Sequence, residues 1–290
     1  MQEGNFIFLV SSRPIKYILV GKSYDFYIKA DKLPGKHPFS RLELLVGPER
    51  LKALAGARVI VFGVGGVGSW CAEGLVRSGV GTVTIVDFDD VCVTNINRQL
   101  QATSLSVGKS KVEEIVRRLR EINPKAEIEG RHRIYNLETK REFDLGGYDY
   151  VIDAIDSLSS KVDLIMNASA SGAAVFSSLG AACKVDPTRV RVSSIWKSDR
   201  CRLGKFVRKR LRRWGFKGDF LCVWSDEPEF CVDSGNDVSV EDIVDEDINA
   251  NTNDAPTNKT INGSLVNVTA VFGFTLSGLV FQDIIKQARP

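Results

Sequence analysis

The sequence predicts an α/β fold of the Rossmann type, an open and mainly parallel sheet with helices on both faces. Short apolar runs alternate with segments of helical pattern, as expected where helices connect parallel strands. Two of these runs, "ARVIVFGV" and "YDYVIDAID", are almost continuously apolar, which is typical of strands buried on both faces. The first run leads into Gly63-x-Gly65-x-x-Gly68, the spacing of a nucleotide-binding turn between a strand and a helix.

Five strands and the helices around them can be assigned from local patterns. Pro48 suits the first turn of a helix, Gly79 suits the residue after one, and Pro124 stops a third. The expected helices are 39–56, 67–79, 111–124 and 158–172, and the expected strands are 57–64, 82–89, 127–134, 148–156 and 173–181.

The chain is expected to contain one main domain with additions. Residues 1–36 lack a clear hydrophobic period and lead into "DKLPGKHP", which is typical of a linker, so they are expected to form an N-terminal appendage. Residues 37–290 form the main domain, with an acidic loop insertion at 226–259. The apolar run Val268–Phe281 is shorter than a membrane span and has polar flanks, so no span is predicted and a buried or interface helix is expected.

Charge is distributed unevenly along the chain. The formal net charge is +3, yet residues 197–217 are strongly cationic and residues 226–254 contain no Lys or Arg. A basic helix suits a polyanion such as RNA, although a solvated cationic helix gives the same pattern. The candidate RNA-binding residues are Lys205, Arg208, Lys209, Arg212 and Arg213.

Cysteine spacing bears on the compartment. The six cysteines are scattered and form no C-x-x-C pair, which argues against a zinc site. The N-terminal "NFIFLV" is too short for the apolar core of a secretory signal. A reducing compartment is therefore expected, with the cytoplasm as the first choice and the surface of the mitochondrial outer membrane as the alternative.

The glycine turn indicates a nucleotide ligand. Gly63 permits a tight turn, Gly65 with Gly66 lets the backbone approach a phosphate, and Gly68 lets the helix pack closely. The helix N-terminus favours the anion. An acidic residue follows at the end of the next strand, where it can accept hydrogen bonds from a ribose. On its own, this pattern fits a dehydrogenase that binds NAD as well as an enzyme that binds ATP.

Residues beyond the second strand favour a triphosphate over NAD. The stretch "DDVCVTNINRQLQ" supplies Asn95, Arg98 and Gln99, and Lys111 opens the next helix. Two cations suit a triphosphate whose α-phosphorus is attacked, because charge builds there and on the leaving pyrophosphate. Asp156, which ends "VIDAID", is then placed to hold Mg²⁺. The alternative is that Arg98 and Lys111 are surface cations and that Asp156 caps a helix.

The motifs carry a family resemblance. "GVGGVGS", "IVDFDDV", "TNINRQ", "GKSK" and "VIDAIDS" resemble the ThiF/MoeB-type adenylating superfamily, which includes ubiquitin-activating enzymes and activators of sulfur-carrier proteins. Within it, "FSRLELLVG", "REINP" and "KVDPTRVRVSSIWKSDRCRLGKFVRKRLRR" are similar to the family of tRNA threonylcarbamoyladenosine dehydratases. The resemblance runs from about residue 39 to 217 and resumes in the C-terminal apolar segment.

The resemblance implies an enzyme that uses ATP and Mg²⁺ to cyclise threonylcarbamoyladenosine next to the tRNA anticodon, through an acyl-adenylate. Arg41 matches an arginine that family members insert into the neighbouring subunit's nucleotide site, which implies a homodimer. Beyond tRNA and a second copy of the chain, a sulfur-transfer partner system is an open expectation. The implied catalytic residues are Arg41, Arg98, Lys111 and Asp156, with Asp156 as the metal ligand, and the implied nucleotide-binding residues are Gly63, Gly65, Gly66, Gly68, Asp87, Asp89, Asn95, Arg98, Gln99 and Lys111.

Two alternatives belong to different functional classes. Another adenylating enzyme would activate the C-terminus of a ubiquitin-like or sulfur-carrier protein, and its mark would be zinc ligands or a nucleophilic cysteine. Cys231 is the candidate for that cysteine, although a cysteine without a catalytic role is favoured at this position. A non-catalytic RNA-binding protein could keep the fold without the phosphate-binding cations. Arg98, Lys111 and Asp156 are all present, which favours an enzyme.

Overall fold

The computed structural model describes residues 37–228, 230 and 262–288. The contacts within the chain divide it into Met1–Ser40 and Arg41–Pro290, so this division falls just after the boundary expected at residue 36. The N-terminal segment 1–36, most of the acidic segment 226–259, and Cys231 lie outside the described residues.

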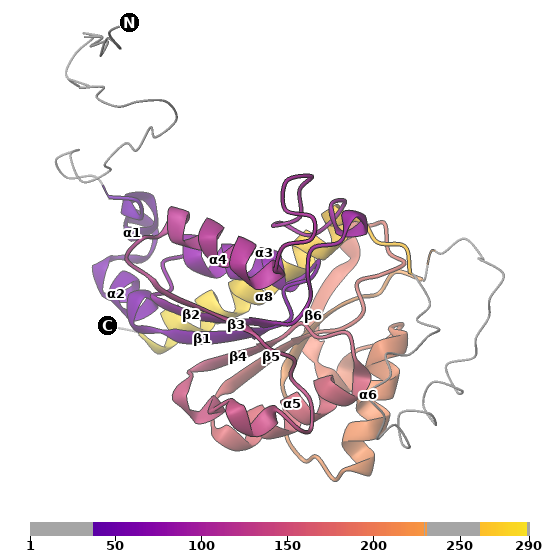
Figure 1. The fold of residues 1–290 in the computed structure, drawn as a ribbon. Helices are drawn as coiled ribbons and strands as arrows, with labels where there is room; N and C mark the ends of the chain where they lie inside the picture. The colour runs from indigo at the N-terminus through magenta and orange to yellow at the C-terminus, as the bar shows by residue number, and fades with distance from the viewer. Residues whose placement is uncertain (1–36, 229, 231–261, 289–290) are drawn as a thin grey trace, which may run out of the picture. The chain divides into compact units, whose positions relative to one another are not determined.

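One seven-stranded sheet forms the centre of the described part of the chain (Figure 1). Its order is β3-β2-β1-β4-β5-β7-β6, and neighbouring strands are parallel except β6, which is antiparallel to β7. This arrangement confirms the predicted open, mainly parallel sheet. The strands are β1 (Arg58–Phe62), β2 (Thr82–Asp87), β3 (Glu127–His132), β4 (Tyr150–Asp153), β5 (Ala174–Ser178), β6 (Val190–Ser194) and β7 (Leu221–Ser225).

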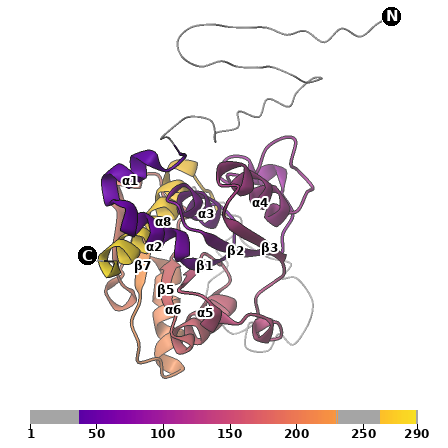
Figure 2. The ribbon, with the colours of Figure 1, turned by 90° about the vertical axis from the view of Figure 1, so that its left-hand side faces the viewer.

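Helices cover both faces of the sheet, as both ribbon views show (Figures 1 and 2). On one face lie α2 (Pro48–Gly56), α3 (Gly68–Arg77), α4 (Lys111–Ile122) and α8 (Val266–Gln287), and on the other lie α5 (Leu158–Ser171) and α6 (Arg202–Arg213). A short helix, α1 (Ser40–Val46), precedes α2.

The central position of β1 in the sheet explains why its residues from Val59 to Phe62 are all apolar. Val59 and Val61 belong to the apolar cluster that includes side chains of α3, α4 and α8. Ile60 and Phe62 belong to the cluster that includes side chains of α5 and α6. Because successive side chains of a strand point to opposite faces, each residue from Val59 to Phe62 meets a hydrophobic core, while Arg58 at the start of the strand is exposed.

α8 occupies the apolar C-terminal segment. Among the described helices it alone is long and apolar enough to cross a membrane, and in this structure it packs against α3. Val268, Phe272 and Leu276 are buried in that contact layer. The backbones approach closely, since a Cβ atom on Gly273 would lie 2.4 Å from the carbonyl oxygen of Val67. The expected buried helix is therefore longer than the apolar run that predicted it.

Two features differ from the sequence prediction. The single helix expected at 39–56 is two helices, interrupted at Gly47, whose φ of 82° breaks the helical backbone. The strands β6 and β7 were not predicted. The edge strand β6 is partly exposed and lacks the continuous apolar run that identifies a central strand.

Candidate active site

The predicted site residues gather at one edge of the sheet because parallel strands end together. β1 ends at Phe62 beside Val86 of β2 and beside Asp153 of β4. The glycine turn, the segment after β2 and the β4–α5 loop therefore all leave the sheet at the same edge. Crevices outside the carboxyl ends of the strands are where ligands bind in open α/β sheets.

The glycine turn is held by contacts on both sides. Gly63 has a φ of 83°, which favours glycine, and its N–H donates to the carbonyl of Val86 at 2.8 Å. On the opposite side, a Cβ atom on Gly63 would lie 2.8 Å from the carbonyl oxygen of Ala154 in the β4–α5 loop. The N–H of Val64 donates to Asp87 Oδ2 at 2.7 Å. The turn is thus fixed by residues of two neighbouring strands before α3 begins at Gly68.

Asp87 and Asp89 have different environments. Both carboxylate oxygens of the buried Asp87 already accept backbone N–H groups, Oδ2 from Val64 and Oδ1 from Asp89 at 2.9 Å. The side chain of Asp89 is 48% exposed, and its Oδ2 lies 2.6 Å from Nζ of Lys111. Asp87 therefore shapes the turn, whereas Asp89 keeps a half-exposed carboxylate next to it.

Lys111 opens α4 at the same edge. Its helix is capped by Ser110, whose Oγ accepts from the backbone N–H of Glu113 at 3.4 Å. Only 7% of the Lys111 side chain is exposed, and its ammonium group is paired with Asp89. The predicted phosphate-binding cation is thus held in one orientation.

Arg98 and Gln99 lie over the glycine turn. A Cβ atom on Gly66 would lie 3.4 Å from Cγ of Arg98, and one on Gly65 would lie 3.8 Å from Nε2 of Gln99. The Arg98 guanidinium donates to the carbonyl of Thr94 at 2.7 Å and to the Asn97 carboxamide at 3.0 Å. The structure therefore brings both residues to the turn where phosphates were predicted to bind.

Asn95 and Gln101 support the loop from inside. The carboxamide oxygen of the buried Asn95 accepts the Cys92 N–H at 3.0 Å, so this side chain fixes the first turn after β2. Gln101 was not among the predicted site residues. Its Nε2 donates to the carbonyl of Val64 at 2.8 Å, within the glycine turn. Its distance along the sequence from the glycines leaves no local signal for that contact.

The β4–α5 loop carries Asp156, the predicted metal ligand, as an exposed residue. The described residues contain no group of three or more His, Cys, Asp or Glu side chains suited to a metal ion. Mg²⁺ in nucleotide sites commonly uses one or two carboxylates together with phosphate oxygens and water. An exposed carboxylate on the loop that abuts the glycine turn therefore fits Mg²⁺ bound together with a triphosphate.

Below this loop, a buried ion pair was missed by sequence reasoning. Lys161 of α5 and Asp153 at the end of β4 are both fully buried, with Nζ 2.6 Å from Oδ2. A lysine directly before the largely apolar stretch "VDLIM", shortly after "VIDAID", was the available signal. The lysine was not singled out because its partner lies in a different element.

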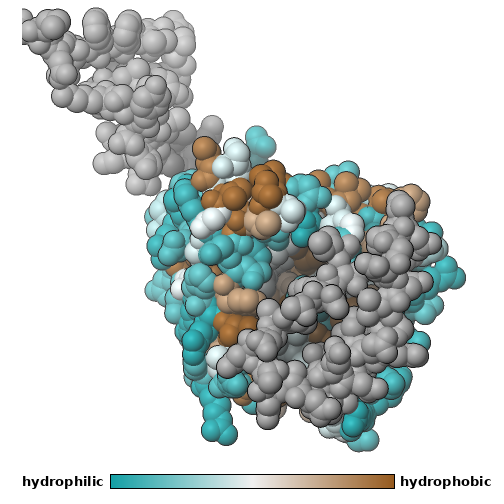
Figure 3. Space-filling view, turned by 45° about the vertical axis from the view of Figure 1, so that its right-hand side comes forward, coloured by the Kyte–Doolittle hydropathy of each residue, from teal (hydrophilic) through white to brown (hydrophobic). Residues whose placement is uncertain are grey.

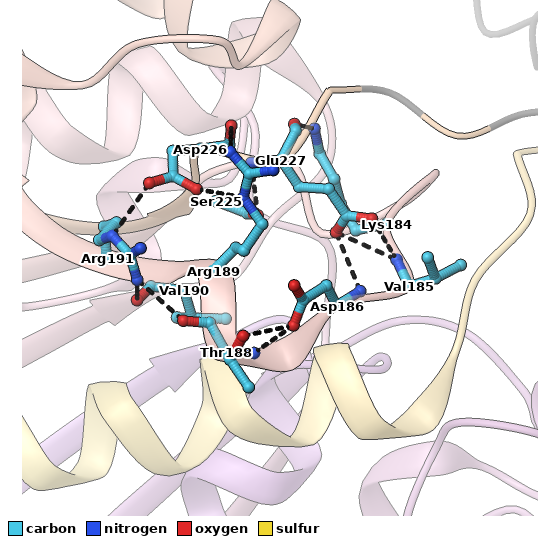
Figure 4. A network of polar contacts seen from close by, with 10 residues as sticks. All are labelled: Lys184, Val185, Asp186, Thr188, Arg189, Val190, Arg191, Ser225, Asp226 and Glu227. Atoms are coloured by element: carbon cyan, nitrogen blue, oxygen red, sulfur yellow. Dashed lines mark hydrogen bonds and ion pairs between the residues drawn. The ribbon is translucent and has the colours of Figure 1, made fainter.

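Beyond β7, a polar network fixes the loops at this edge of the sheet (Figure 4). The buried carboxylate of Glu227 accepts the backbone N–H groups of Val185 and Asp186, at 3.1 and 3.0 Å. The buried ammonium group of Lys184 donates to the Glu227 carbonyl. The chain before β6 is thereby tied to the chain after β7.

The same network contains an exposed ion cluster. Asp226 lies 2.7 Å from Nε of Arg189 and 3.0 Å from Nε of Arg191 (Figure 4). The hydrogen bond from Arg189 holds the pKa of the Asp226 carboxyl below its usual value. Next to this cluster, the N–H of Phe230 donates to the carbonyl of Cys183 at 2.7 Å, and the N–H of Cys183 donates to the carbonyl of Gly263 at 2.9 Å. The chain on either side of residues 231–262 therefore meets at Cys183.

α6 presents most of the predicted RNA-binding cations to solvent. Lys205, Lys209, Arg212 and Arg213 are exposed. Arg212 lies over the ring of Trp196, with its Cζ 5.2 Å from the ring centroid. Two arginines of the helix instead face the protein: Arg208 donates to Ser198, and Arg210 donates to Ser159 of α5 at 2.7 Å. The solvent-facing charge thus lies on one side of the helix.

α1 exposes apolar side chains next to Arg41. Leu44 is 89% exposed and Leu45 is 76% exposed, on the helix that also carries the exposed Arg41. The space-filling view shows that apolar side chains gather in places among the hydrophilic surface (Figure 3). Two largely exposed leucines side by side are typical of a surface covered by another molecule.

The described free cysteines are Cys71, Cys92, Cys201 and Cys222, and only Cys92 is exposed. The hydroxyl of Thr94 donates to the Cys92 sulfur at 3.2 Å, which lowers the pKa of this thiol below its usual value. Burial raises the pKa of Cys222 to about 12.

Comparison with known proteins identifies close relatives. The model of the ThiF family matches residues 39–286. The tRNA threonylcarbamoyladenosine dehydratase of Bacillus subtilis is 39% identical over 86% of this chain and 95% of that protein, and that of Haemophilus influenzae is 33% identical over 86% and 94%. The crystal structure of the Escherichia coli enzyme in complex with AMP superposes with a TM-score of 0.73 at 32% identity, covering 87% of this chain and 95% of that one. A second crystal structure of the Escherichia coli enzyme contains ATP.

Proposed function

Because the chain belongs to the ThiF family, we propose that it is an ATP-dependent tRNA threonylcarbamoyladenosine dehydratase. The observation that carries this function is the match to two dehydratases over nearly their whole length, at 39% and 33% identity. It is supported by Arg98 and Lys111, the cations predicted to bind phosphate, which lie at the same edge of the sheet as the glycine turn.

The reaction consists of two substitutions. In the first, the carboxylate of the threonyl group attacks the α-phosphorus of ATP, and pyrophosphate leaves. In the second, the neighbouring ureido group attacks the activated carbonyl and closes the ring, and AMP leaves with one carboxylate oxygen. The tRNA product has lost the elements of water, and ATP has become AMP and pyrophosphate. The second step is intramolecular, so correct positioning supplies much of its rate.

The cations at the glycine turn stabilise charge in the first step. Arg98 and Lys111 bind the phosphates, where negative charge grows as the α-phosphorus is attacked and the pyrophosphate departs. When the phosphates engage Lys111, Asp89 loses its ion pair and becomes an acceptor for the ribose hydroxyls. Asp87, predicted from sequence as the ribose ligand, also holds the turn through Val64, and each of its carboxylate oxygens keeps a lone pair that can accept a ribose hydroxyl.

Mg²⁺ would be held by Asp156 together with the phosphates and would neutralise their charge. The support for this assignment is the position of Asp156 on the loop that abuts Gly63. Asn95 and Gln99 complete the surroundings. Asn95 fixes the loop after β2, and Gln99 faces the turn at Gly65.

α6 is proposed to bind the tRNA backbone. The support is its row of exposed cations at residues 205, 209, 212 and 213, which is suited to a strand of phosphates. The inward-facing Arg208 and Arg210 hold the helix against the protein and are not proposed as phosphate ligands.

Arg41 is proposed to complete the nucleotide site of a second copy of the chain. Its own helix exposes Leu44 and Leu45, which gives this copy an apolar contact surface next to the guanidinium. A homodimer with this contact has two equivalent sites, each containing Arg41 from the other subunit.

The function is tested with purified protein, ATP, Mg²⁺ and tRNA that carries threonylcarbamoyladenosine. Digestion to nucleosides and mass spectrometry should reveal a species lighter by one water, formed with equal amounts of AMP. Isotope exchange between pyrophosphate and ATP should require this tRNA. Exchange that requires a ubiquitin-like or sulfur-carrier protein instead would replace this function with protein activation. NAD binding tighter than ATP binding would exclude both.

A further inference from the structure

A fully buried ion pair lies directly beneath the β4–α5 loop. The ammonium group of Lys161 lies 2.6 Å from Asp153 Oδ2, 2.8 Å from the carbonyl of Ser178 and 3.5 Å from Oγ of Ser177. Both charged side chains are 0% exposed. The three ammonium protons thus have three acceptors, two of them close, so the hydrogen-bonding capacity of this buried group is satisfied.

Stability alone is a weak reason for a buried ion pair, because an apolar pair of similar volume is often equally stable. The carboxylate of Asp153 also has two partners besides Lys161. Oδ2 accepts the Ser177 hydroxyl at 2.6 Å, and Oδ1 accepts the backbone N–H of Ile155 at 3.1 Å.

The hydrogen bond to Ile155 folds the start of the loop back onto Asp153. Asp156 is the next residue along the chain, so the orientation of the Ile155 peptide determines the position of the Asp156 backbone, from which its carboxylate extends. Lys161 and Ser177 hold the opposite carboxylate oxygen and prevent Asp153 from rotating. The loop is therefore fixed from α5 and from β5 at once.

The same loop supports the glycine turn. The N–H of Ala154 donates to the carbonyl of Phe62 at 2.9 Å, and its carbonyl oxygen lies 2.8 Å from where a Cβ atom on Gly63 would be. A shift of the loop would therefore move the phosphate turn as well as Asp156.

We propose that Lys161 is a positioning residue: through Asp153, it sets the β4–α5 loop so that the Asp156 carboxylate and the glycine turn meet one Mg²⁺–nucleotide. Lys161 does not touch the nucleotide. This inference rests on the proposed function only in requiring that the chain bind ATP with Mg²⁺.

The test measures the Mg²⁺ concentration that half-saturates ATP binding, by calorimetry and without tRNA. Lys161→Met keeps the aliphatic stem and removes the ammonium group, and it should raise this concentration about tenfold or more, as loss of groups that orient metal ligands commonly does. AMP binding without Mg²⁺ should change much less. A purely structural role would reduce the fraction of folded protein and leave the half-saturating concentration unchanged.

Two further variants keep the test decisive. Ser177→Ala removes only one hydrogen bond to Asp153, so it should fold even where Lys161→Met does not, and it should raise the half-saturating concentration severalfold. The control is Lys140→Met, which breaks another ion pair to α5, with Asp163 at 2.8 Å, away from the loop. It should leave the Mg²⁺ dependence unchanged.

Unchanged half-saturation in both Ser177→Ala and a folded Lys161→Met would overturn the positioning role while leaving the proposed function intact. If Lys161→Met is unfolded, Ser177→Ala alone decides. A wild-type protein that does not bind ATP with Mg²⁺ would overturn the proposed function itself, and the positioning role with it.

Discussion

The ammonium nitrogen of Lys111 lies 2.6 Å from Oδ2 of Asp89. The lysine side chain is 7% exposed and the aspartate side chain is 48% exposed, so only the carboxylate of this ion pair is accessible to solvent. Water can therefore solvate the carboxylate when the pair separates. A phosphate can therefore replace Asp89 as the partner of Lys111 with a small cost in free energy, because neither charge is left buried and unpaired.

Lys111→Ala and Arg98→Ala should each reduce kcat/KM for adenylation by about 10²–10³, roughly 2.7–4 kcal/mol, as expected for loss of a group that stabilises transition-state charge. The measurement is pyrophosphate exchange with the tRNA substrate. Lys109→Ala is the matched control, since its ammonium lies 3.6 Å from Glu114 and 56% of its side chain is exposed. A loss for Lys109→Ala equal to that for Lys111→Ala would contradict a specific role for Lys111.

Asp87→Asn and Asp89→Asn should separate stability from binding. Asp87 accepts two backbone N–H groups, and an amide NH₂ would face one of them, so this variant should lose about 1–3 kcal/mol of unfolding free energy. Asp89→Asn should lose less stability and mainly raise the KM for ATP. Urea unfolding and steady-state kinetics measure the two effects. The opposite ranking would mean that Asp87, and not Asp89, receives the ribose.

Arg41→Ala and Asp156→Ala should each be nearly inactive, and a mixture should regain part of the activity. In a mixed dimer, one site combines the Asp156 of the first chain with the Arg41 of the second, so it is intact. The other site lacks both. Activity is measured after subunit exchange has been confirmed with tagged chains. No recovery would show that Arg41 does not act across a subunit boundary.

Replacing Lys205 and Lys209 by Ala should weaken tRNA binding and reduce its salt dependence. Each lost phosphate contact lowers the slope of log K against log salt by about 0.7–0.9. Arg210→Ala removes a cation of the same helix that faces Ser159, so it should leave the slope almost unchanged. Filter binding at several salt concentrations measures all three. Equal slopes for wild type and the double variant would remove α6 from the tRNA interface.

Cys92 should react with iodoacetamide before the other described free thiols. The hydrogen bond from Thr94 lowers its pKa, so the thiolate forms at a lower pH than for an ordinary cysteine, and alkylation should decline only when the pH falls below this lowered value. Mass spectrometry after brief labelling at several pH values tests this order. Cys92→Ser should retain most of the cyclising activity, since ring closure on an adenylate needs no protein thiol. Loss of activity in a folded, ATP-binding Cys92→Ser would instead favour a thioester intermediate.

The parts of the fold and site that the sequence predicted are those fixed by neighbouring residues. The glycine turn, its strand and its helix are contiguous, so their pattern suffices, and the ends of β1, β2 and β4 then meet because the strands are parallel. The pairing of β6 with β7 joins segments separated by the whole of α6, so no local pattern of apolar residues predicts it. The roles of individual polar atoms were likewise hidden. Asp87 occupies the predicted place, but only the structure shows that Val64 and Asp89 use both of its oxygens.

The backbone of Cys183 forms hydrogen bonds with both Phe230 and Gly263, so these two residues lie close together. Chain added between these residues begins and ends at the same point, so it changes no strand register and no distance within the sheet. The entropy cost of such a loop grows slowly, by about 0.6 kcal/mol for each doubling of its length. This position is therefore a suitable insertion point, where an affinity tag or a small reporter domain can be accommodated while the glycine turn and the strand ends around it keep their geometry.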